Sequence, residues 1–238
     1  MTPSDISLAL DDLDRSPGYR ALRFDPGAPL GGRVAVLPSA FNPPTLAHLY
    51  LLQVAQAVDG VGGGVALLTT RNVAKAVVGA TLADRVGMLL ASREEQPSLS
   101  VVAANAARLA DQAKALRASF PGTSFDFVVG YDTLIRLFDE VYYEDMPAQL
   151  GAFFSEHRVI ATNRGEISIE AVREFVAGIG RPFRERIVVR EIGREPASLS
   201  STAARMAIAH GDEPLAIPAG VAAYIRGHGL YRSGLASG

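Results

Sequence analysis

The sequence predicts an α/β fold, a doubly wound parallel sheet in a single domain. Short apolar runs alternate along the chain with longer stretches of helical periodicity, the rhythm of strand–helix units. Most of these runs are continuously apolar, which is typical of strands covered on both faces. With 48% hydrophobic residues, a chain of 238 residues has enough apolar surface for one large core.

The apolar runs define six expected strands. These are Val34–Leu37, Val65–Leu68, Leu99–Ala103, Phe125–Val129, Arg158–Ala161 and Ile187–Glu191. Amphipathic stretches between and after them predict helices at Leu46–Val58, Leu82–Glu95, Asn105–Ser119, Thr133–Phe138, Ala148–Ser155, Ile169–Ala177, Thr202–His210 and Pro218–Arg226. Together they predict a Rossmann-like sheet with a helical C-terminal portion. Residues 1–30, amphipathic around Ile6–Leu13, are interpreted as an extension packed on a domain of residues 31–238.

Composition excludes several classes of protein. The 23 basic and 25 acidic residues provide no basic field for a nucleic acid polymer or an anionic membrane. Without cysteine, thiol nucleophiles and thiolate metal sites are impossible, and four histidines make a multi-histidine metal site improbable. The first residues lack a basic signal-peptide start, and no apolar run reaches the roughly 18 residues of a spanning helix. We therefore expect a soluble cytoplasmic protein; the sequence leaves open whether it forms a homo-oligomer.

Glycines give no dinucleotide fingerprint. Gly60, Gly62, Gly63 and Gly64 precede the second expected strand, whereas a G-x-G-x-x-G motif must follow a strand and open a helix. This placement disfavours an NAD-binding dehydrogenase and predicts a helix-to-strand turn.

The turn after the first expected strand is the most informative segment. A helix expected to start at Pro43–Pro44 carries Thr45 and His48 on one face of its first turn. Ligands bind at the carboxyl ends of parallel strands, and the N–H groups of a helix start attract phosphate. Taken alone, a T-x-x-H segment is more often a helix cap and a half-buried histidine.

The context of this segment points to a family. The stretch Ala40-Phe41-Asn42-Pro43-Pro44-Thr45-Leu46-Ala47-His48 resembles the (H/T)-x-G-H signature of nucleotidyltransferases, and most closely that of nicotinamide/nicotinate mononucleotide adenylyltransferases. Ser39 and Ala40 stand where the family has a glycine-rich turn, and Ala47 replaces the glycine before the histidine. The resemblance extends over about residues 33–231 and implies a nucleotidyltransferase domain.

Later stretches resemble further motifs of the family. Lys75 occupies the position of a loop lysine that approaches substrate phosphates, and Arg85 fills the following L-x-x-R-x-x-M-L pattern. Gly130 and Asp132 match a G-x-D at the nucleotide ribose. Tyr142 stands in a region where the family commonly has a tryptophan, and it is a candidate for stacking on a base ring. The simpler interpretation is that Lys75 is an ordinary surface lysine in a loop and that Tyr142 is a core tyrosine.

The last polar motif lies near residue 200. Ser200, Ser201 and Thr202 begin a helix that carries Arg205, and they resemble the family's I-S-S-T-x-x-R motif for ATP phosphates. Helix capping alone also explains these hydroxyls. Arg164 follows the fifth expected strand, where relatives carry a substrate-facing arginine.

The resemblance implies transfer of AMP from ATP to nicotinamide or nicotinate mononucleotide, with release of pyrophosphate, in NAD biosynthesis. It assigns catalysis to His48, Thr45, Lys75 and Arg205. It assigns nucleotide binding to Ser39, Ala40, Phe41, Asn42, Gly130, Asp132, Ser200, Ser201 and Thr202, and substrate binding to Arg85, Tyr142 and Arg164. Mg²⁺ would arrive with ATP, and no metal site of the protein is expected. Two alternatives stay open: a pantetheine-phosphate adenylyltransferase-like enzyme and a non-catalytic nucleotide-binding regulator.

Overall fold

The computed structural model describes residues 1–71, 79–163, 165–193, 199–213 and 216–232. Within these ranges seven strands form one sheet in the order β1-β4-β3-β2-β5-β6-β7. All neighbours from β4 to β7 pair in parallel. The expected doubly wound α/β fold is confirmed, since the parallel strands begin with β2 in the middle of the sheet and are added outward in both directions.

The elements have the following bounds. The strands are β1 (Ala21–Arg23), β2 (Gly32–Pro38), β3 (Gly63–Thr69), β4 (Leu99–Ala104), β5 (Thr123–Gly130), β6 (Arg158–Thr162) and β7 (Ile187–Arg190). The α-helices are α1 (Pro3–Arg15), α2 (Leu46–Gln56), α3 (Leu82–Ala91), α4 (Leu109–Ser119), α5 (Tyr131–Leu137), α6 (Met146–Glu156), α7 (Ile169–Gly178), α8 (Arg181–Arg184), α10 (Ser201–His210) and α11 (Ala219–His228). Two 3₁₀ turns are η1 (Ser92–Glu94) and η2 (Glu140–Tyr142).

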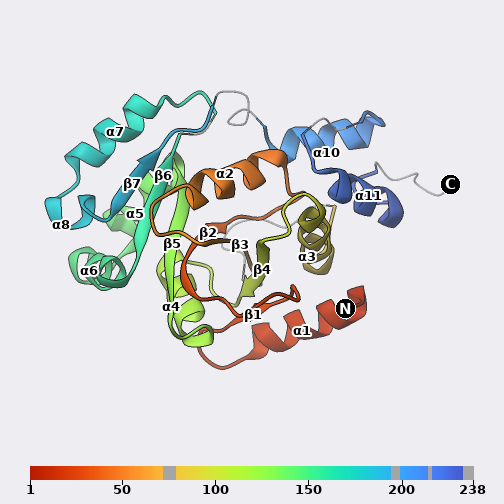
Figure 1. Cartoon of the computed structure of the whole chain (residues 1–238), viewed down its shortest axis with the longest axis horizontal. Coiled ribbons are helices and arrows are strands. Elements are labelled where there is room, and N and C mark those ends of the chain that lie inside the picture. Colours follow the sequence, from red (N-terminus) through yellow and green to blue (C-terminus); the bar gives the residue numbers. More distant parts are fainter. Residues whose placement is uncertain (72–78, 164, 194–198, 214–215, 233–238) are drawn as a thin grey trace.

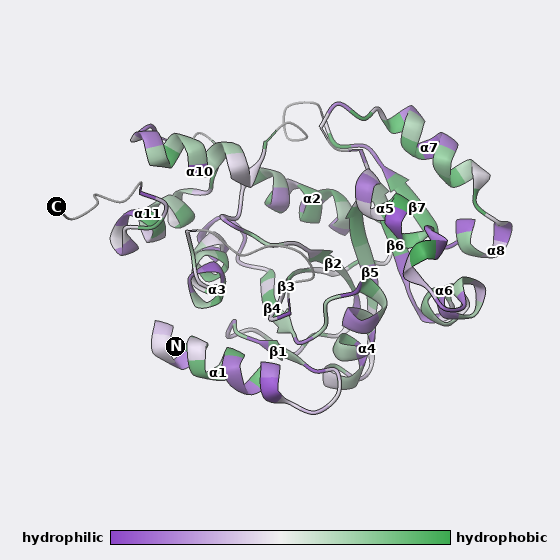
Figure 2. Cartoon of the chain, turned by 180° about the vertical axis from the view of Figure 1, so that it is seen from behind, coloured by the Kyte–Doolittle hydropathy of each residue, from purple (hydrophilic) through white to green (hydrophobic). Residues whose placement is uncertain are grey.

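The sheet separates two apolar cores. Along β2, Val34 and Val36 belong to the core under α4, α5, α6 and α7. The alternate residues Ala35 and Leu37 belong to the core under α1, α2 and α3. Because successive strand residues point to opposite faces, continuous apolar runs are required here. Figure 2 shows the central strands in the hydrophobic colour, with hydrophilic and hydrophobic turns alternating along α1 and α7.

The N-terminal extension adds an element that the sequence did not predict. Its helix α1 buries Ile6, Leu10 and Leu13, and β1 pairs antiparallel with β4 at the edge of the sheet. The sheet is therefore mixed rather than wholly parallel. At three residues, β1 is too short for a periodic pattern to be visible in the sequence.

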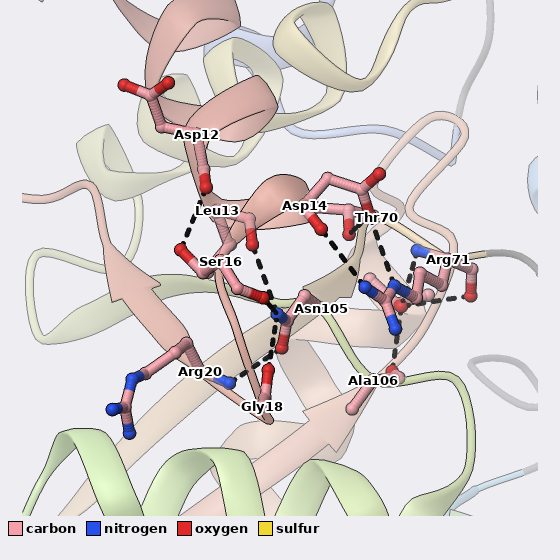
Figure 3. A network of polar contacts seen from close by, with 11 residues as sticks. Asp12, Leu13, Asp14, Ser16, Gly18, Arg20, Thr70, Arg71, Asn105 and Ala106 are labelled. Carbon is pink, nitrogen blue, oxygen red and sulfur yellow. Dashed lines mark hydrogen bonds and ion pairs between the residues drawn. The ribbon is translucent and has the colours of Figure 1, made fainter.

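Several expected helix boundaries are wrong. The helix expected from Asn105 begins at Leu109, because the buried Asn105 amide nitrogen donates to backbone oxygens of Leu13, Ser16 and Gly18 (Figure 3). The helix expected to reach Glu95 ends at Ala91 and continues as η1.

The C-terminal stop is also displaced. Helix α11 continues to His228, two residues beyond the expected Arg226, and is capped by the left-handed Gly229, with φ +63°. The short helix α8 was not expected.

The C-terminal helices form a third layer at one end of the molecule. Figure 1 shows α10 and α11 beside α3, away from α7 and α8. A small core of Met88, Ala204, Val221 and Ile225 joins them. A Cβ on Gly220 would lie 2.5 Å from the backbone oxygen of Ala91, so only glycine permits this approach of α11 to α3. The packing brings the end of the chain to the site described next.

Candidate functional site

The site lies where the winding of the sheet reverses. Strand β2 is hydrogen-bonded to β3 on one side and to β5 on the other. The chain leaves β2 toward α2 on one face and leaves β5 toward α5 on the opposite face. Such a switch point opens a crevice at the carboxyl ends of the strands. Two predicted segments border it, the turn after β2 and the Gly130-Tyr131-Asp132 segment after β5.

His48 is held in one orientation by the start of its own helix. Its Nδ1 accepts the backbone N–H of Thr45 at 3.0 Å and lies 2.8 Å from Thr45 Oγ1. Because Nδ1 is an acceptor, the neutral ring carries its hydrogen on Nε2, which lies 3.1 Å from Ser39 Oγ. The Phe41 ring packs against the imidazole with centroids 4.9 Å apart. The arrangement presents a fixed N–H donor beside Ser39.

Thr45 therefore contacts the histidine. It is fully buried and is the N-cap of α2, which begins at Leu46 and not at the expected Pro43–Pro44. The N–H of Leu46 donates to the backbone oxygen of Ala216 at 2.8 Å. Two N–H groups expected to be open to a phosphate, those of Thr45 and Leu46, are thus already bonded within the chain.

The motif loop, residues 39–45, is held through its backbone oxygens by side chains from distant elements. The Arg85 guanidinium donates to Ala40 O at 3.1 Å and the Arg205 guanidinium to Asn42 O at 2.6 Å. Ser201 Oγ donates to Pro43 O at 2.7 Å. Helices α3 and α10 are therefore fastened to the turn after β2, and three predicted site residues meet there.

Tyr231 completes this arrangement, although it is not among the site residues predicted from the sequence. Its hydroxyl donates to Asn42 Oδ1 at 2.6 Å. Burial raises the pKa of Tyr231, while the charges of Arg205 and Arg85 act in the opposite direction. Tyr231 ends the stretch of about residues 33–231 over which the family resemblance extends, and that resemblance was the available signal for this residue.

Two arginines from other helices bring positive charge to the motif loop. Burial lowers the pKa of Arg85, although the group stays a cation near neutral pH. Among the described residues, neither Arg85 nor Arg205 forms an ion pair with a carboxylate. Two guanidinium groups without acidic partners favour an anionic ligand at this loop.

Phe41 gives the loop a strained backbone. It has φ +45°, a left-handed conformation that is costly for a large side chain, and it is buried. Outliers of this kind cluster at binding and catalytic sites, where the surroundings hold them in place.

At the start of α10, the hydroxyls have partners within the chain. Ser200 is the N-cap and accepts the N–H of Ala203 at 3.1 Å, and Thr202 Oγ1 accepts from Arg205 at 3.2 Å. Their phosphate-binding role stays a prediction.

The remaining predicted residues that the structure describes lie on other elements. Gly130 is the N-cap of α5, and Asp132 is exposed in the first turn of that helix. Tyr142 is 48% exposed in η2 and lines a groove between the α5–α6 connection and Arg108. Lys75 and Arg164 lie outside the described residues.

The described ranges offer neither a metal site nor a membrane-spanning helix. They contain no cluster of three or more His, Cys, Asp or Glu side chains suited to a metal ion. No helix among them is both long and apolar enough to cross a bilayer.

Fold and site together define a Rossmann-like α/β protein in which two guanidinium groups bind the loop at the switch point of the sheet. No protein-family model matches the chain. It is 28% identical over 196 residues to a putative nicotinamide mononucleotide adenylyltransferase of Schizosaccharomyces pombe, covering 76% of this chain and 77% of that protein. It is 24% identical over 204 residues to a probable nicotinate-nucleotide adenylyltransferase of Neisseria meningitidis serogroup B, covering 84% and 98%.

Solved structures agree with the fold. Plasmodium falciparum nicotinic acid mononucleotide adenylyltransferase complexed with NaAD superposes with a TM-score of 0.61 at 16% identity, covering 84% of this chain and 97% of that one. The same enzyme complexed with APC gives 0.59 at 14% identity, with the same coverage. The chain is thus similar in sequence to proteins named as nicotinamide or nicotinate mononucleotide adenylyltransferases, the family that its motifs resemble.

Proposed function

We propose that the protein transfers AMP from MgATP to the 5′-phosphate of nicotinamide or nicotinate mononucleotide, releasing pyrophosphate, as a step of NAD biosynthesis. The observation that carries this proposal is the fixed His48 Nε2–H at the switch point of the sheet. The relatives named for this reaction support it. Because both substrates are nucleotides, the cytoplasm is the compartment in which we expect the protein, with residues 31–238 as the catalytic domain.

The reaction needs no protein nucleophile. A 5′-phosphate oxygen of the mononucleotide attacks the α-phosphorus of ATP, a new P–O–P bond forms, and the bond to the β-phosphate oxygen breaks. Negative charge grows on the non-bridging α-phosphate oxygens and on the departing pyrophosphate. Catalysis of this kind rests on positioning and on neutralising charge. Mg²⁺ arrives bound to ATP as part of the substrate, and water molecules supply most of its other ligands.

His48 is suited to the developing charge on the α-phosphate. In the proposed mechanism its Nε2–H donates to a non-bridging oxygen, replacing its contact with Ser39. Thr45 acts through the ring, because its backbone N–H keeps Nδ1 an acceptor and so keeps the donor on Nε2. A hydrogen-bond donor that is already aligned costs no reorganisation in the transition state.

We assign the two arginines different tasks. Arg205 is half-buried and donates to the motif loop through Nη1 and to Thr202 through Nη2, which places its charge at the start of α10. We assign it to the leaving pyrophosphate together with Ser201 and Thr202, with Lys75 offsetting phosphate repulsion. Arg85 is buried and bonds backbone oxygens of Thr81 and Ala40, so we assign it to positioning the loop for substrate.

A single histidine substitution tests the proposal. We expect His48→Ala to lower the turnover number by about 10²–10³-fold, the effect of deleting one transition-state donor. The matched control is His210→Ala, an exposed histidine in the last turn of α10, which should retain wild-type turnover. Pyrophosphate release is measured with ATP, Mg²⁺ and each mononucleotide, and circular dichroism verifies that both variants are folded.

The acceptor substrate that supports pyrophosphate release distinguishes the proposed function from its two alternatives. Release of pyrophosphate with phosphopantetheine, and not with a pyridine mononucleotide, would replace the proposed substrate. ATP binding without release for any acceptor would indicate a regulator. Near-wild-type turnover of His48→Ala would remove His48 from the mechanism.

A further inference from the structure

A groove lies on the side of the sheet that α4 to α7 cover. Of the site residues described above, only Tyr142 lines it. Its volume is about 280 Å³. It is lined by Arg108, Val141, Tyr142, Tyr143, Glu144 and Gln149. The lining comes from two parts of the chain that the fold brings together, the start of α4 and the connection between α5 and α6.

The groove belongs to the same edge of the sheet as the motif loop. Arg108 follows the carboxyl end of β4 by four residues, immediately before α4. Beside it, Thr69 Oγ1 at the end of β3 donates to Ala106 O at 2.8 Å. The other wall follows α5, which starts where β5 ends. The groove thus lies between the start of α4, just after the carboxyl end of β4, and the segment that follows α5.

Its chemistry combines aromatic rings with opposite charges. Tyr142 is 48% exposed in the groove, whereas Tyr143 is half-buried and donates its hydroxyl to Leu137 O at 2.6 Å. Burial raises the pKa of Tyr143, and the positive charge of Arg108, which lines the same groove, acts in the opposite direction. Arg108 is exposed and has no ion pair among the described residues. Glu144 adds a carboxylate on the same groove.

Resting on the proposed function and on the ring stacking that the sequence resemblance implies for Tyr142, we propose that Arg108 binds the carboxylate of a nicotinate ring in this groove, which makes nicotinate mononucleotide the preferred acceptor. The pyridinium ring of either mononucleotide is a flat cation, suited to a tyrosine face and to the charge of Glu144. The two substrates differ in one group. Nicotinate carries an anionic carboxylate that a guanidinium binds with two parallel hydrogen bonds, whereas the amide of nicotinamide is neutral.

The residues on the groove therefore have separable effects. Arg108 acts on the group that differs between the substrates, so its loss should reduce discrimination. Tyr142 acts on the ring that both substrates share, so its loss should weaken both equally. If Arg108 had only a structural role, its loss would lower kcat/KM for both mononucleotides by the same factor. The ratio of the two kcat/KM values would then stay unchanged.

The test compares kcat/KM for the two mononucleotides in four variants. For Arg108→Gln we expect about a 10- to 100-fold loss with nicotinate mononucleotide, the range of a charge-assisted hydrogen bond, and little change with nicotinamide mononucleotide. Arg108→Lys should recover part of the loss, because it restores charge without the fork of donors. Tyr142→Leu should lower both values alike. Arg173→Gln, at an exposed arginine of α7, is the matched control.

Dissociation constants of both mononucleotides, measured by calorimetry, separate this inference from the proposed function. If pyrophosphate is never released but nicotinate mononucleotide binds more tightly and loses that advantage in Arg108→Gln, the groove assignment stands and the reaction does not. If both mononucleotides react and Arg108→Gln leaves their ratio unchanged, the inference is overturned while the proposed function stands. Binding of neither mononucleotide overturns both.

Discussion

His157 shows how the surroundings of one side chain set its chemistry. The residue ends α6 and is buried against Phe127 and Phe153, whose ring centroids lie 5.6 and 5.3 Å from that of the imidazole. Its Nδ1 has no hydrogen-bond partner within the described ranges. Burial lowers the pKa of His157, because the apolar site disfavours the charged ring.

The direction of this shift predicts how stability depends on pH. Above the ordinary histidine pKa of about 6.5, the ring is neutral in the folded and the unfolded chain. As the pH falls below it, the unfolded chain binds a proton that the folded chain excludes, so the free energy of unfolding decreases. His157→Phe should show a smaller decrease between pH 7.5 and 5.5 in urea titrations. Equal decreases in both proteins would contradict the assignment, since the other histidines are unchanged.

Sequence motifs located single residues well but left their contacts undetermined. They predicted that Thr45 and His48 share a face, because helical spacing alone requires it. That Nδ1 receives a backbone N–H, which decides the position of the ring hydrogen, depends on the extended conformation of Thr45. The contact from Tyr231 to Asn42 joins positions 189 residues apart, and no local pattern reports such a pair.

The N-terminal extension is fastened to the sheet through one buried asparagine (Figure 3). Asn105 Nδ2 donates to the backbone oxygens of Leu13, Ser16 and Gly18, and Asn105 Oδ1 accepts the N–H of Arg20 at 2.7 Å. Nearby, Asp14 accepts from Thr70 Oγ1 at 2.6 Å and forms an ion pair with Arg71. The extension therefore reaches the residues that follow β3 and β4.

Removing this side chain should loosen the whole extension. Asn105→Ala leaves several buried backbone groups without partners, so we expect a loss of about 3 kcal/mol in the free energy of unfolding. Chemical denaturation measures the loss, and limited proteolysis should show earlier cleavage before residue 21. The control Gln53→Ala, an exposed position on α2, should stay within about 0.5 kcal/mol of wild type. A loss below about 1 kcal/mol for Asn105→Ala would show that the extension is held by its apolar face alone.

Hydrophobic periodicity identified the helices and parallel strands because each buries an apolar face many residues long. It did not find β1 or the true start of α4. Both depend on the Asn105 network, in which polar groups from distant segments satisfy each other and override local propensity.

Across the molecule, the site is assembled from almost the full length of the chain. The motif loop follows the first strand of the parallel sheet, yet Arg85, Ser201, Arg205 and the backbone of Ala216 hold it in place. Because the third core binds α10 and α11 to α3, the C-terminal helices have no independent position. Local sequence patterns were sufficient to predict the fold class. They did not predict that the C-terminal helices pack against the motif loop, since this packing depends on contacts between distant segments.

The stability of the assembled molecule in acid should depend on Asp25, which links the extension to the sheet. Its buried carboxylate accepts from Arg23 at 2.6 Å, from Arg93 at 2.8 Å and from the Val101 N–H at 2.7 Å. Burial by itself raises the pKa of Asp25, but the hydrogen bonds from Arg23 and Val101 outweigh it and hold the pKa below its usual value. The carboxylate therefore stabilises the fold above the ordinary aspartate pKa of about 4, and this contribution is lost as the pH falls through the lower folded-state pKa.

Asp25→Asn should be less stable than wild type by about 3 kcal/mol at pH 7, because two arginines lose their buried partner. It should also lose less additional stability between pH 5 and pH 3, since the variant has no carboxylate there to protonate. Urea titrations at the three pH values measure both effects. Asp12→Asn is the matched control, because the ion pair of Asp12 with Arg15 is exposed and contributes less than about 1 kcal/mol. If Asp25→Asn retains the wild-type acid dependence, another carboxylate controls acid unfolding and the Asp25 network is only a local contact.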